Sequence, residues 1–237
     1  MYTHLKLLPK ADLIRTGPVD EAEWNYRPVL GWISRQRIRL VASLLPKPVG
    51  RLLKIGYGSG VSLPHFAKFA GELHGIDPHP HPREVEAKLA KHGVKAFLRS
   101  GTAEAMPYET GFFDSVAAIS AMEFIPDLDA ACREIRRVLK PGGSFVFVTP
   151  GRSPLVDFGL KLMTGRSAKD DFAERRERIV PTLREHFDFG AENAFPIWPK
   201  RAINLYTAYR LTPHPIAASD YAASLASERS ACLTSSN

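Results

Sequence analysis

One short stretch restricts the fold of this chain more than any other. Residues 51–55 form a largely apolar run that leads directly into Gly56, Gly58 and Gly60. The run predicts a buried strand, and the glycines predict a tight turn on which a ligand can lie against the backbone, because glycine has no Cβ. A helix expected over Ser62–Ala70 would present unpaired N–H groups to an anionic ligand. The sequence therefore predicts a strand, a ligand-binding turn and a helix.

From residue 51 to residue 150, apolar runs alternate with helical patterns. Further strands are expected over Glu72–Ile76, Ala96–Ser100, Phe113–Ser120 and Ser144–Thr149. Helices are expected over Pro82–His92 and Asp127–Lys140, with Pro141-Gly142-Gly143 ending the second. This alternation predicts right-handed crossovers and an α/β fold with a parallel sheet that helices cover on both faces. Such sheets bind ligands at the carboxyl ends of their strands.

Two regions flank this alternating part. Pro28 is expected to open a helix, and Pro46 and Pro48 to end it. Later elements are expected as helices over Ser153–Met163 and Ala168–Leu183 and a hairpin of Phe187–Phe195 with Ile203–Leu211. The expected units are an N-terminal helical segment that covers the substrate (1–50), a ligand-binding domain (51–212) with a helical insertion (151–186), and a mobile tail (213–237).

Composition narrows the class of protein. The net charge of +7 and the isoelectric point of about 9.5 favour an acidic small molecule, a lipid headgroup or a nucleic acid as partner. No apolar run approaches the roughly 20 residues that cross a bilayer. Met1–Lys10 is too interrupted by charge and proline to be a signal peptide. The two cysteines have no metal-binding or redox spacing, so we expect a cytoplasmic protein.

A carboxylate follows the second expected strand. Asp77 lies about 20 residues after Gly56, where an acidic residue can accept hydrogen bonds from both hydroxyls of a ribose. Val61 stands where a dinucleotide-binding turn has its third glycine or an alanine, and no Gly-Lys-Ser/Thr follows to form a P-loop. The pattern therefore indicates adenosine or a similar nucleoside, and argues against NAD, FAD and nucleoside triphosphates.

Five segments in this order resemble the class I S-adenosylmethionine-dependent methyltransferases, especially the small-molecule branch like methyltransferase type 11. The segments are Leu53–Gly60, Gly75–Asp77, Gly101–Tyr108, Phe113–Val116 and Arg137–Gly143. The resemblance covers roughly residues 51–211. It implies a Rossmann-like three-layer sandwich whose mostly parallel seven-stranded sheet has an antiparallel last strand. It also implies S-adenosyl-L-methionine as cofactor and S-adenosyl-L-homocysteine as product.

The same resemblance gives individual residues a role. Gly56 and Gly58 would lie under the methionine part of the cofactor, and Asp77 would hold the ribose. The other cofactor residues that it implies are Thr102 and Ala103 at the adenine, Ser120 at the mouth of the pocket, and Lys54, Tyr57, Gly60 and Pro78 beside the glycine turn and Asp77.

Two of these positions depart from the family pattern. Lys54 stands where the family usually has an acid that helps to hold the ammonium of the cofactor. At about 5 Å and an effective dielectric constant near 20, the repulsion would be on the order of 3 kcal/mol, or about two decades in affinity. The lysine could relieve it by reaching water or by pairing with the cofactor carboxylate, and we expect Lys54→Glu to tighten cofactor binding. Thr102 stands where the family often has Asp, so adenine recognition would depend more on the backbone amide of Ala103.

Methyl transfer is an in-line displacement at a carbon that the sulfonium activates, so the protein must chiefly align the acceptor and exclude water. An oxygen or carbon acceptor must also lose a proton. The candidate bases are Glu123, His65, His79, His81 and Tyr57. Glu123 is favoured because it follows the fourth strand, where acceptors approach in this fold. We expect no metal site, because His79 and His81 have no cysteine or carboxylate cluster near them in the sequence.

The acceptor pocket is expected between the N-terminal segment and residues 151–186, whose aromatic and basic side chains suit an acidic or amphipathic small molecule. A lipid or quinone met at a membrane surface is a variant. The side chains concerned are Trp24, Tyr26, Trp32, Arg35, Arg152, Lys161, Arg166, Arg175 and Arg176. The residues leave open whether O, N or C is methylated.

Two alternatives remain at this point. The positive charge would suit a nucleic-acid or protein methyltransferase, although Ser120–Glu123 replaces the Asn/Asp-Pro-Pro-aromatic motif of base methylases. Lys54 would suit a non-catalytic protein of this fold with weakened cofactor binding.

Overall fold

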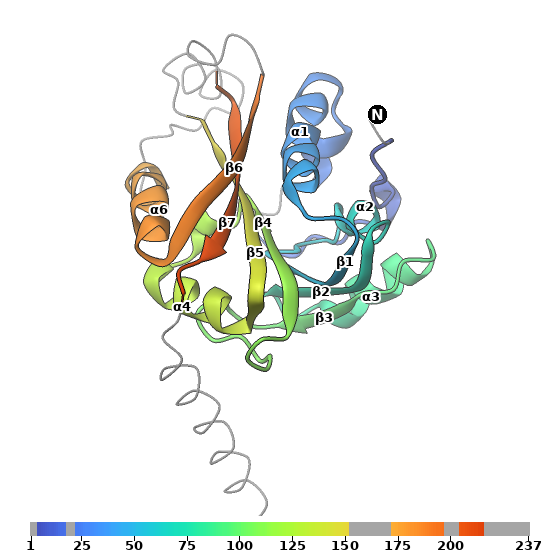
Figure 1. The fold of residues 1–237 in the computed structure, drawn as a ribbon. Helices are drawn as coiled ribbons and strands as arrows, with labels where there is room; N and C mark the ends of the chain where they lie inside the picture. Colours follow the sequence, from blue (N-terminus) through green and yellow to red (C-terminus); the bar gives the residue numbers. More distant parts are fainter. Residues whose placement is uncertain (1–3, 18–21, 152–171, 197–203, 216–237) are drawn as a thin grey trace, which may run out of the picture.

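The computed structural model describes residues 4–17, 22–151, 172–196 and 204–215 (Figure 1). Its centre is a seven-stranded sheet with the strand order β3-β2-β1-β4-β5-β7-β6. The strands are β1 Val49–Ile55, β2 Ala70–Asp77, β3 Phe97–Ser100, β4 Phe113–Ile119, β5 Leu139–Pro150, β6 Phe187–Phe195 and β7 Tyr206–Pro213. The first five strands are parallel, and β7 runs antiparallel to both β5 and β6. The predicted fold class is confirmed.

Helices cover both faces of the sheet and define two separate cores. They are α1 Pro28–Leu44, α2 Leu63–Phe66, α3 Pro82–Ala90, α4 Leu128–Val138 and α6 Phe172–His186, with short 3-10 helices η1 Lys10–Asp12, η2 Ala22–Tyr26 and η3 Met122–Phe124. Helices α4 and α6 contribute to one core, and α1, α2 and α3 contribute to the other. The helices on the two sides of the sheet in Figure 1 therefore pack against apolar side chains on both faces of its strands. Among the described helices, none combines the length and apolar character needed to span a bilayer.

Helix α4 shows how the sequence pattern produces this packing. The carboxylate of Asp127 caps the helix by accepting a hydrogen bond from the backbone N–H of Ala130. Its buried residues recur at helical spacing and are Leu128, Ala131, Cys132, Ile135 and Val138. Cys132 is a free, buried thiol whose pKa burial raises to about 12, so it packs as a small apolar residue.

Three expected elements differ from the structure. The helix expected over Ser62–Ala70 is the single turn α2, because Phe69 already accepts a hydrogen bond from Val49 N where the chain enters β2. The helix expected over Asp127–Lys140 ends at Val138 instead. Strand β5 begins before the Pro-Gly-Gly sequence, where Leu139 pairs with Phe113, and Gly142 takes a φ of +76° in the bend.

Other expected elements lie partly or wholly outside the described residues. The helix expected over Ser153–Met163 and nearly all of the expected tail fall there, while the helix expected over Ala168–Leu183 is α6. Strands β6 and β7 form the expected hairpin, although β7 starts at Tyr206 rather than at residue 203.

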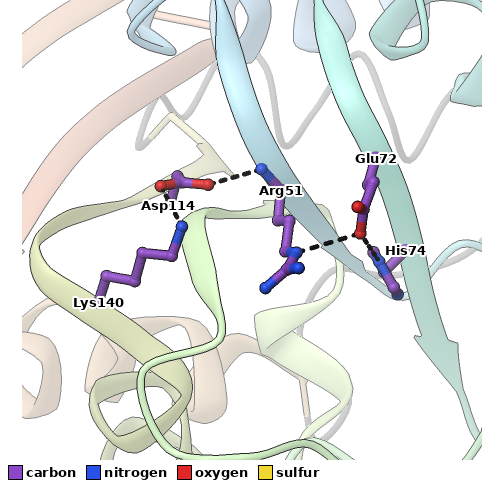
Figure 2. A network of polar contacts seen from close by, with 5 residues as sticks. All are labelled: Arg51, Glu72, His74, Asp114 and Lys140. Carbon is purple, nitrogen blue, oxygen red and sulfur yellow. Dashed lines mark hydrogen bonds and ion pairs between the residues drawn. The ribbon is translucent and has the colours of Figure 1, made fainter.

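A polar network connects the strands near their amino ends (Figure 2). Asp114 accepts hydrogen bonds from the backbone N–H of Arg51 at 2.6 Å and from the ammonium of Lys140 at 2.7 Å. The guanidinium of Arg51 donates to Glu72 at 3.1 Å, and the ring of His74 lies 3.4 Å from the same carboxylate oxygen. Each of the four charged groups in this network has a partner of opposite charge, which ties β1, β2, β4 and β5 together.

Candidate active site

The glycine turn lies at the carboxyl end of β1, beside the end of β2. Gly56, Gly58 and Gly60 all have positive φ values, at +65°, +50° and +77°. A Cβ on Gly56 would lie 2.7 Å from the Cβ of Ala121, and a Cβ on Gly60 would lie 2.8 Å from a methyl group of Val85. Both the backbone conformation and the close packing therefore require glycine at these two positions.

Asp77 ends β2 and faces this turn. One carboxylate oxygen accepts a hydrogen bond from Gly58 N at 2.8 Å, and the other accepts from His79 N at 3.3 Å. Each carboxylate oxygen has capacity for a further hydrogen bond. The side chain is only 15% exposed, so it is held in place while its remaining lone pairs stay available to a ligand.

His79 is a part of the site that the sequence singled out only as a candidate base. Its ring nitrogen Nε2 lies 3.1 Å from Gly58 O, and its ring meets that of Tyr57 edge-on at 4.8 Å between centroids. His79 is buried. His79 and Asp77 therefore both contact the backbone of Gly58. In this structure the role of His79 is to position the turn.

Lys54 occupies the interior beneath the turn. Its side chain is buried, and its ammonium nitrogen donates to Ile55 O at 2.7 Å and to Gly56 O at 2.8 Å. Burial, with a smaller contribution from Arg37, lowers the pKa of Lys54 to about 7, although Asp77 and Glu123 oppose the shift. The expectation that the lysine reaches water is therefore wrong: in the structure it turns back onto its own strand.

Arg37 lies at the same edge of the site, although its place in the sequence did not single it out. It projects from α1 toward the end of β4, where its guanidinium donates to Ser120 Oγ at 2.9 Å. The hydroxyl and the carbonyl of Ser34 also accept hydrogen bonds from this guanidinium. One signal was available: Arg35, Arg37 and Arg39 cannot share one helix face, since alternate residues lie about 200° apart.

Ser120 and Glu123 follow β4 at the same edge of the sheet. Ser120 has a φ of +46°, a left-handed conformation that costs free energy for a residue other than glycine and is common at functional sites. Glu123 is buried in η3, and its oxygen Oε2 has no hydrogen-bond partner among the described residues. Burial raises the pKa of Glu123, although Arg176, Arg37 and Lys54 act in the opposite direction. A buried carboxyl with a free oxygen is poised to bind a donor or to accept a proton.

The other candidate bases lie in less suitable surroundings. His65 is packed against Phe66 and Phe69, and burial lowers its pKa to about 4. The phenol of Tyr57 is buried and its pKa is raised by burial, with Asp77 adding to the shift. The ring of His81 lies 2.8 Å from Glu84 on the first turn of α3.

The adenine side of the expected site lies in the loop after β3. Gly101 N donates to Asp77 O at 3.0 Å, which ties this loop to the ribose side. Ala103 is buried, whereas Thr102 and Pro78 are exposed. Within the ranges that the structure describes, no three His, Cys, Asp or Glu side chains gather as a metal site would require.

A groove of about 750 Å³ lies on another face of α1. Trp32, Arg35 and Arg39 from α1 line it, together with residues of the N-terminal segment and Phe195 of β6. The rings of Trp32 and Phe195 are 5.1 Å apart, and Trp32 is 51% exposed. Of the expected acceptor-pocket residues, Arg152, Lys161 and Arg166 and the side chain of Arg175 lie outside the described part.

Comparison with known proteins agrees with this arrangement. Residues 53–147, from β1 through β5, match the family model described as a methyltransferase domain. A sterol 4-C-methyltransferase of Caenorhabditis elegans is 36% identical over 97 residues, which cover 40% of this chain and 29% of that protein. A ubiquinone biosynthesis O-methyltransferase of Xanthomonas oryzae is 27% identical over 172 residues, which cover 70% of this chain and 67% of that protein.

Over residues 53–147 the chain carries a methyltransferase domain. Solved structures share the fold of this methyltransferase. One from Thermotoga maritima, named a SAM-dependent methyltransferase, has a TM-score of 0.55 and 22% identity, and the match covers 77% of this chain and 92% of that one. The [4+2]-cyclase SpnF matches with a TM-score of 0.55 and 19% identity over 77% of this chain and 81% of its own. Because a cyclase is among these neighbours, the fold by itself does not fix the reaction.

The residues of this methyltransferase fit its cofactor. Asp77 retains lone pairs for two ribose hydroxyls, and the backbone of Gly56 and Gly58 is partly exposed beside it. Glu123 offers a buried oxygen without a partner, and Arg37 offers a permanent cation at Ser120. S-adenosylmethionine carries ribose hydroxyls and a carboxylate, so Asp77 and Arg37 would complement these two groups, and Glu123 would remain for the acceptor.

Proposed function

We propose that this methyltransferase transfers the methyl group of S-adenosylmethionine to a small-molecule acceptor. The observation that supports the proposal is the hydrogen bond from the backbone of Gly58 to Asp77, which holds this carboxylate beside the glycine turn, where it would bind the ribose. Asp77 binds the ribose hydroxyls, and Gly56 and Gly58 receive the methionine part. Arg37 holds the cofactor carboxylate through its guanidinium. The remaining residues of the proposed cofactor site are Lys54, Tyr57, Gly60, Pro78, Thr102, Ala103 and Ser120.

The cofactor supplies a methyl group that its sulfonium already activates. The contribution of the protein is to hold the acceptor in line, to exclude water and, for an acidic O–H or C–H acceptor, to take a proton. Glu123 is the proposed base, because its free buried oxygen lies at the edge where β4 ends and burial raises its pKa, which makes the carboxylate a stronger proton acceptor.

We further propose that the acceptor is acidic or amphipathic. The groove beside Trp32 combines an exposed aromatic ring with Arg35 and Arg39, a combination that suits an anionic headgroup with an apolar tail. Arg35 and Arg39 project about 160° away from Arg37 around α1. The groove would therefore contact a headgroup or membrane surface outside the pocket where methyl transfer takes place.

Two relatives are named for sterol methylation and ubiquinone biosynthesis, which supports an acceptor of this character. We place the protein in the cytoplasm, with peripheral contact to membranes at this groove. Cosedimentation with vesicles of phosphatidylglycerol and phosphatidylcholine tests the contact. Binding should need the anionic lipid and should weaken in a Trp32→Ala variant. Equal binding to purely zwitterionic vesicles would contradict the role given to the two arginines.

The experiment that tests the function is methyl transfer from labelled S-adenosylmethionine into a metabolite extract, with the product identified by mass spectrometry. We expect label in an acidic or amphipathic small molecule. Label in RNA or protein would instead establish the alternative that the net charge of +7 favours. Saturable cofactor binding without label in any fraction would favour a non-methylating use of the fold, as the cyclase neighbour illustrates.

A further inference from the structure

Lys54 is a buried basic side chain that no carboxylate contacts directly. It is 2% exposed, and it forms no ion pair with any carboxylate of the described residues. Its two hydrogen bonds go to the carbonyls of Ile55 and Gly56, at 2.7 and 2.8 Å. Lys54 therefore sits under the part of the turn against which the methionine end of the cofactor is proposed to lie.

The hydrogen-bond count at Nζ matches a neutral amine. A neutral lysine has two N–H donors and one lone pair, and the two carbonyls satisfy both donors. An ammonium has a third N–H, and no described residue supplies an acceptor for it. Burying an ionised group that is incompletely paired costs free energy. The geometry alone therefore favours the uncharged form in a closed site.

The charges around Lys54 come from several elements. Asp77 on β2 and Glu123 on η3 favour the ammonium, Arg37 on α1 disfavours it, and burial outweighs all three. Arg176 on α6 partly offsets the effect of Glu123, since it acts on that carboxylate. His79 lies 3.9 Å from Asp77 and can add charge there when protonated. The balance leaves Lys54 with a pKa of about 7, so a modest change in the site can decide its charge.

Cofactor binding would bring such a change. S-adenosylmethionine carries a sulfonium, an ammonium and a carboxylate, and hence a net charge of +1. It would also displace water from the turn. Arg37 is always charged, so the cofactor carboxylate already has a partner at the end of β4. We propose that Lys54 enters the cofactor complex as a neutral amine, and that binding of S-adenosylmethionine below neutral pH therefore releases the Lys54 proton to solvent.

This inference rests on the proposed function and makes Lys54 a specificity-determining residue. S-adenosylhomocysteine lacks the sulfonium and has no net charge, so its complex tolerates the lysine proton better. The affinity for S-adenosylmethionine relative to the product should rise with pH. With Lys54 in place of the family's usual acid, S-adenosylhomocysteine would therefore compete less well with S-adenosylmethionine above neutral pH than below it.

Isothermal titration calorimetry of the full chain tests this directly. Titrations with S-adenosylmethionine in phosphate and in Tris, whose heats of ionisation differ, give the number of protons released. From a Lys54 pKa of about 7 we expect about 0.9 proton at pH 6 and about 0.1 at pH 8, with affinity about tenfold tighter at pH 8. S-adenosylhomocysteine should release fewer protons at pH 6.

A Lys54→Met variant is the matched control, because methionine keeps the length of the side chain and has no proton to lose. It should show neither the Lys54-dependent proton release nor the associated change of affinity between pH 6 and pH 8. The difference between wild type and variant removes any contribution of His79, which both proteins share. Lys54→Arg, with a permanent charge, should bind S-adenosylmethionine at least tenfold more weakly at pH 8. Thermal unfolding of each variant checks that it is folded.

The outcomes separate the inference from the proposed function. Saturable binding with no proton release at pH 6, or with release unchanged in Lys54→Met, overturns the inference and leaves the function intact. Proton uptake with tighter binding at low pH also overturns it, because Lys54 would then pair with the cofactor carboxylate as an ammonium. Absence of saturable binding to the wild type at pH 8 contradicts both.

Discussion

The two ends of the parallel strands differ in how their charged side chains are paired. Near the amino ends, Arg51, Glu72, Asp114 and Lys140 each find a partner of opposite sign within the protein (Figure 2). At the carboxyl ends, the oxygen Oε2 of Glu123 has no partner among the described residues, and Lys54 bonds only to carbonyls. Both ends belong to one sheet, so the difference lies in the side chains and not in the backbone.

The comparison teaches where to look for function in such a sheet. A network whose charges are paired contributes to stability and has little left to offer a ligand. A set of buried polar groups with unused hydrogen-bonding capacity costs free energy in the absence of a ligand and is retained because a ligand uses it. Substitutions at the two ends should therefore differ in kind: one set should change stability, and the other should change binding and turnover.

The largest effect is expected at Glu123. Glu123→Gln keeps the shape of the side chain but removes the proposed base, so turnover with an O–H or C–H acceptor should fall by about 10²- to 10⁴-fold. Cofactor affinity should change much less. Steady-state kinetics with the acceptor from the extract experiment measures this. Activity that persists in Glu123→Gln would remove this residue from the mechanism.

A smaller effect on affinity is expected at Asp77. Asp77→Asn removes the charge that strengthens hydrogen bonds to the ribose, which should weaken cofactor binding about 10- to 100-fold. Asp114→Asn, at the opposite ends of the strands, is the matched control and should bind the cofactor as tightly as wild type. Calorimetric affinities that fall equally in both variants would break the distinction between the two ends.

Lys54→Met should stabilise the fold. Because the pKa of buried Lys54 is lowered from 10.5 to about 7, the unfolded chain binds its proton more readily than the native protein does. The resulting cost is full below about pH 7 and shrinks as the pH rises toward 10.5. At pH 7 the variant should gain about 2 kcal/mol after the lost hydrogen bonds are counted. Urea unfolding at pH 7 and pH 9 measures it, and a variant less stable than wild type at pH 7 would contradict the burial argument.

The smallest effect is expected in the amino-end network. Lys140 and the backbone N–H of Arg51 lower the pKa of Asp114 against the opposing effect of burial, so its stabilising contribution is present above about pH 3.8 and is lost as the pH falls through the lowered value. Since the side chain is 35% exposed, Asp114→Asn should cost only about 1 kcal/mol at pH 7. Thermal unfolding should show this deficit at pH 7 and a smaller one at pH 3. An equal deficit at both values would assign the loss to packing.

The sequence was sufficient for the parts that depend on local pattern. The order of strands and helices followed from hydrophobic spacing, and the glycine turn and Asp77 were located because backbone conformation and ribose binding each demand a residue type. In the structure Asp77 accepts a hydrogen bond from the backbone of the turn, and its predicted role toward the ribose stays a prediction. The roles of Thr102, Ala103 and Ser120 toward the cofactor stay predictions.

What the sequence could not supply depends on how elements dock. Arg37 is one of three arginines on α1, and only the packing of that helix decides which of them reaches Ser120. Lys54 was expected to reach water or the cofactor carboxylate, whereas the buried end of β1 turns it onto backbone carbonyls. His65 was a candidate base until its packing against Phe66 and Phe69 was known.

The central claim is that the carboxyl ends of β1, β2 and β4 form a site for S-adenosylmethionine. A crystal structure of the protein with S-adenosylhomocysteine at saturating concentration tests it most directly. We predict density for the ribose within hydrogen-bonding distance of the Asp77 carboxylate and for the amino-acid end against Gly56 and Gly58. Well-ordered crystals with this turn empty, or with the ligand bound elsewhere, would contradict it.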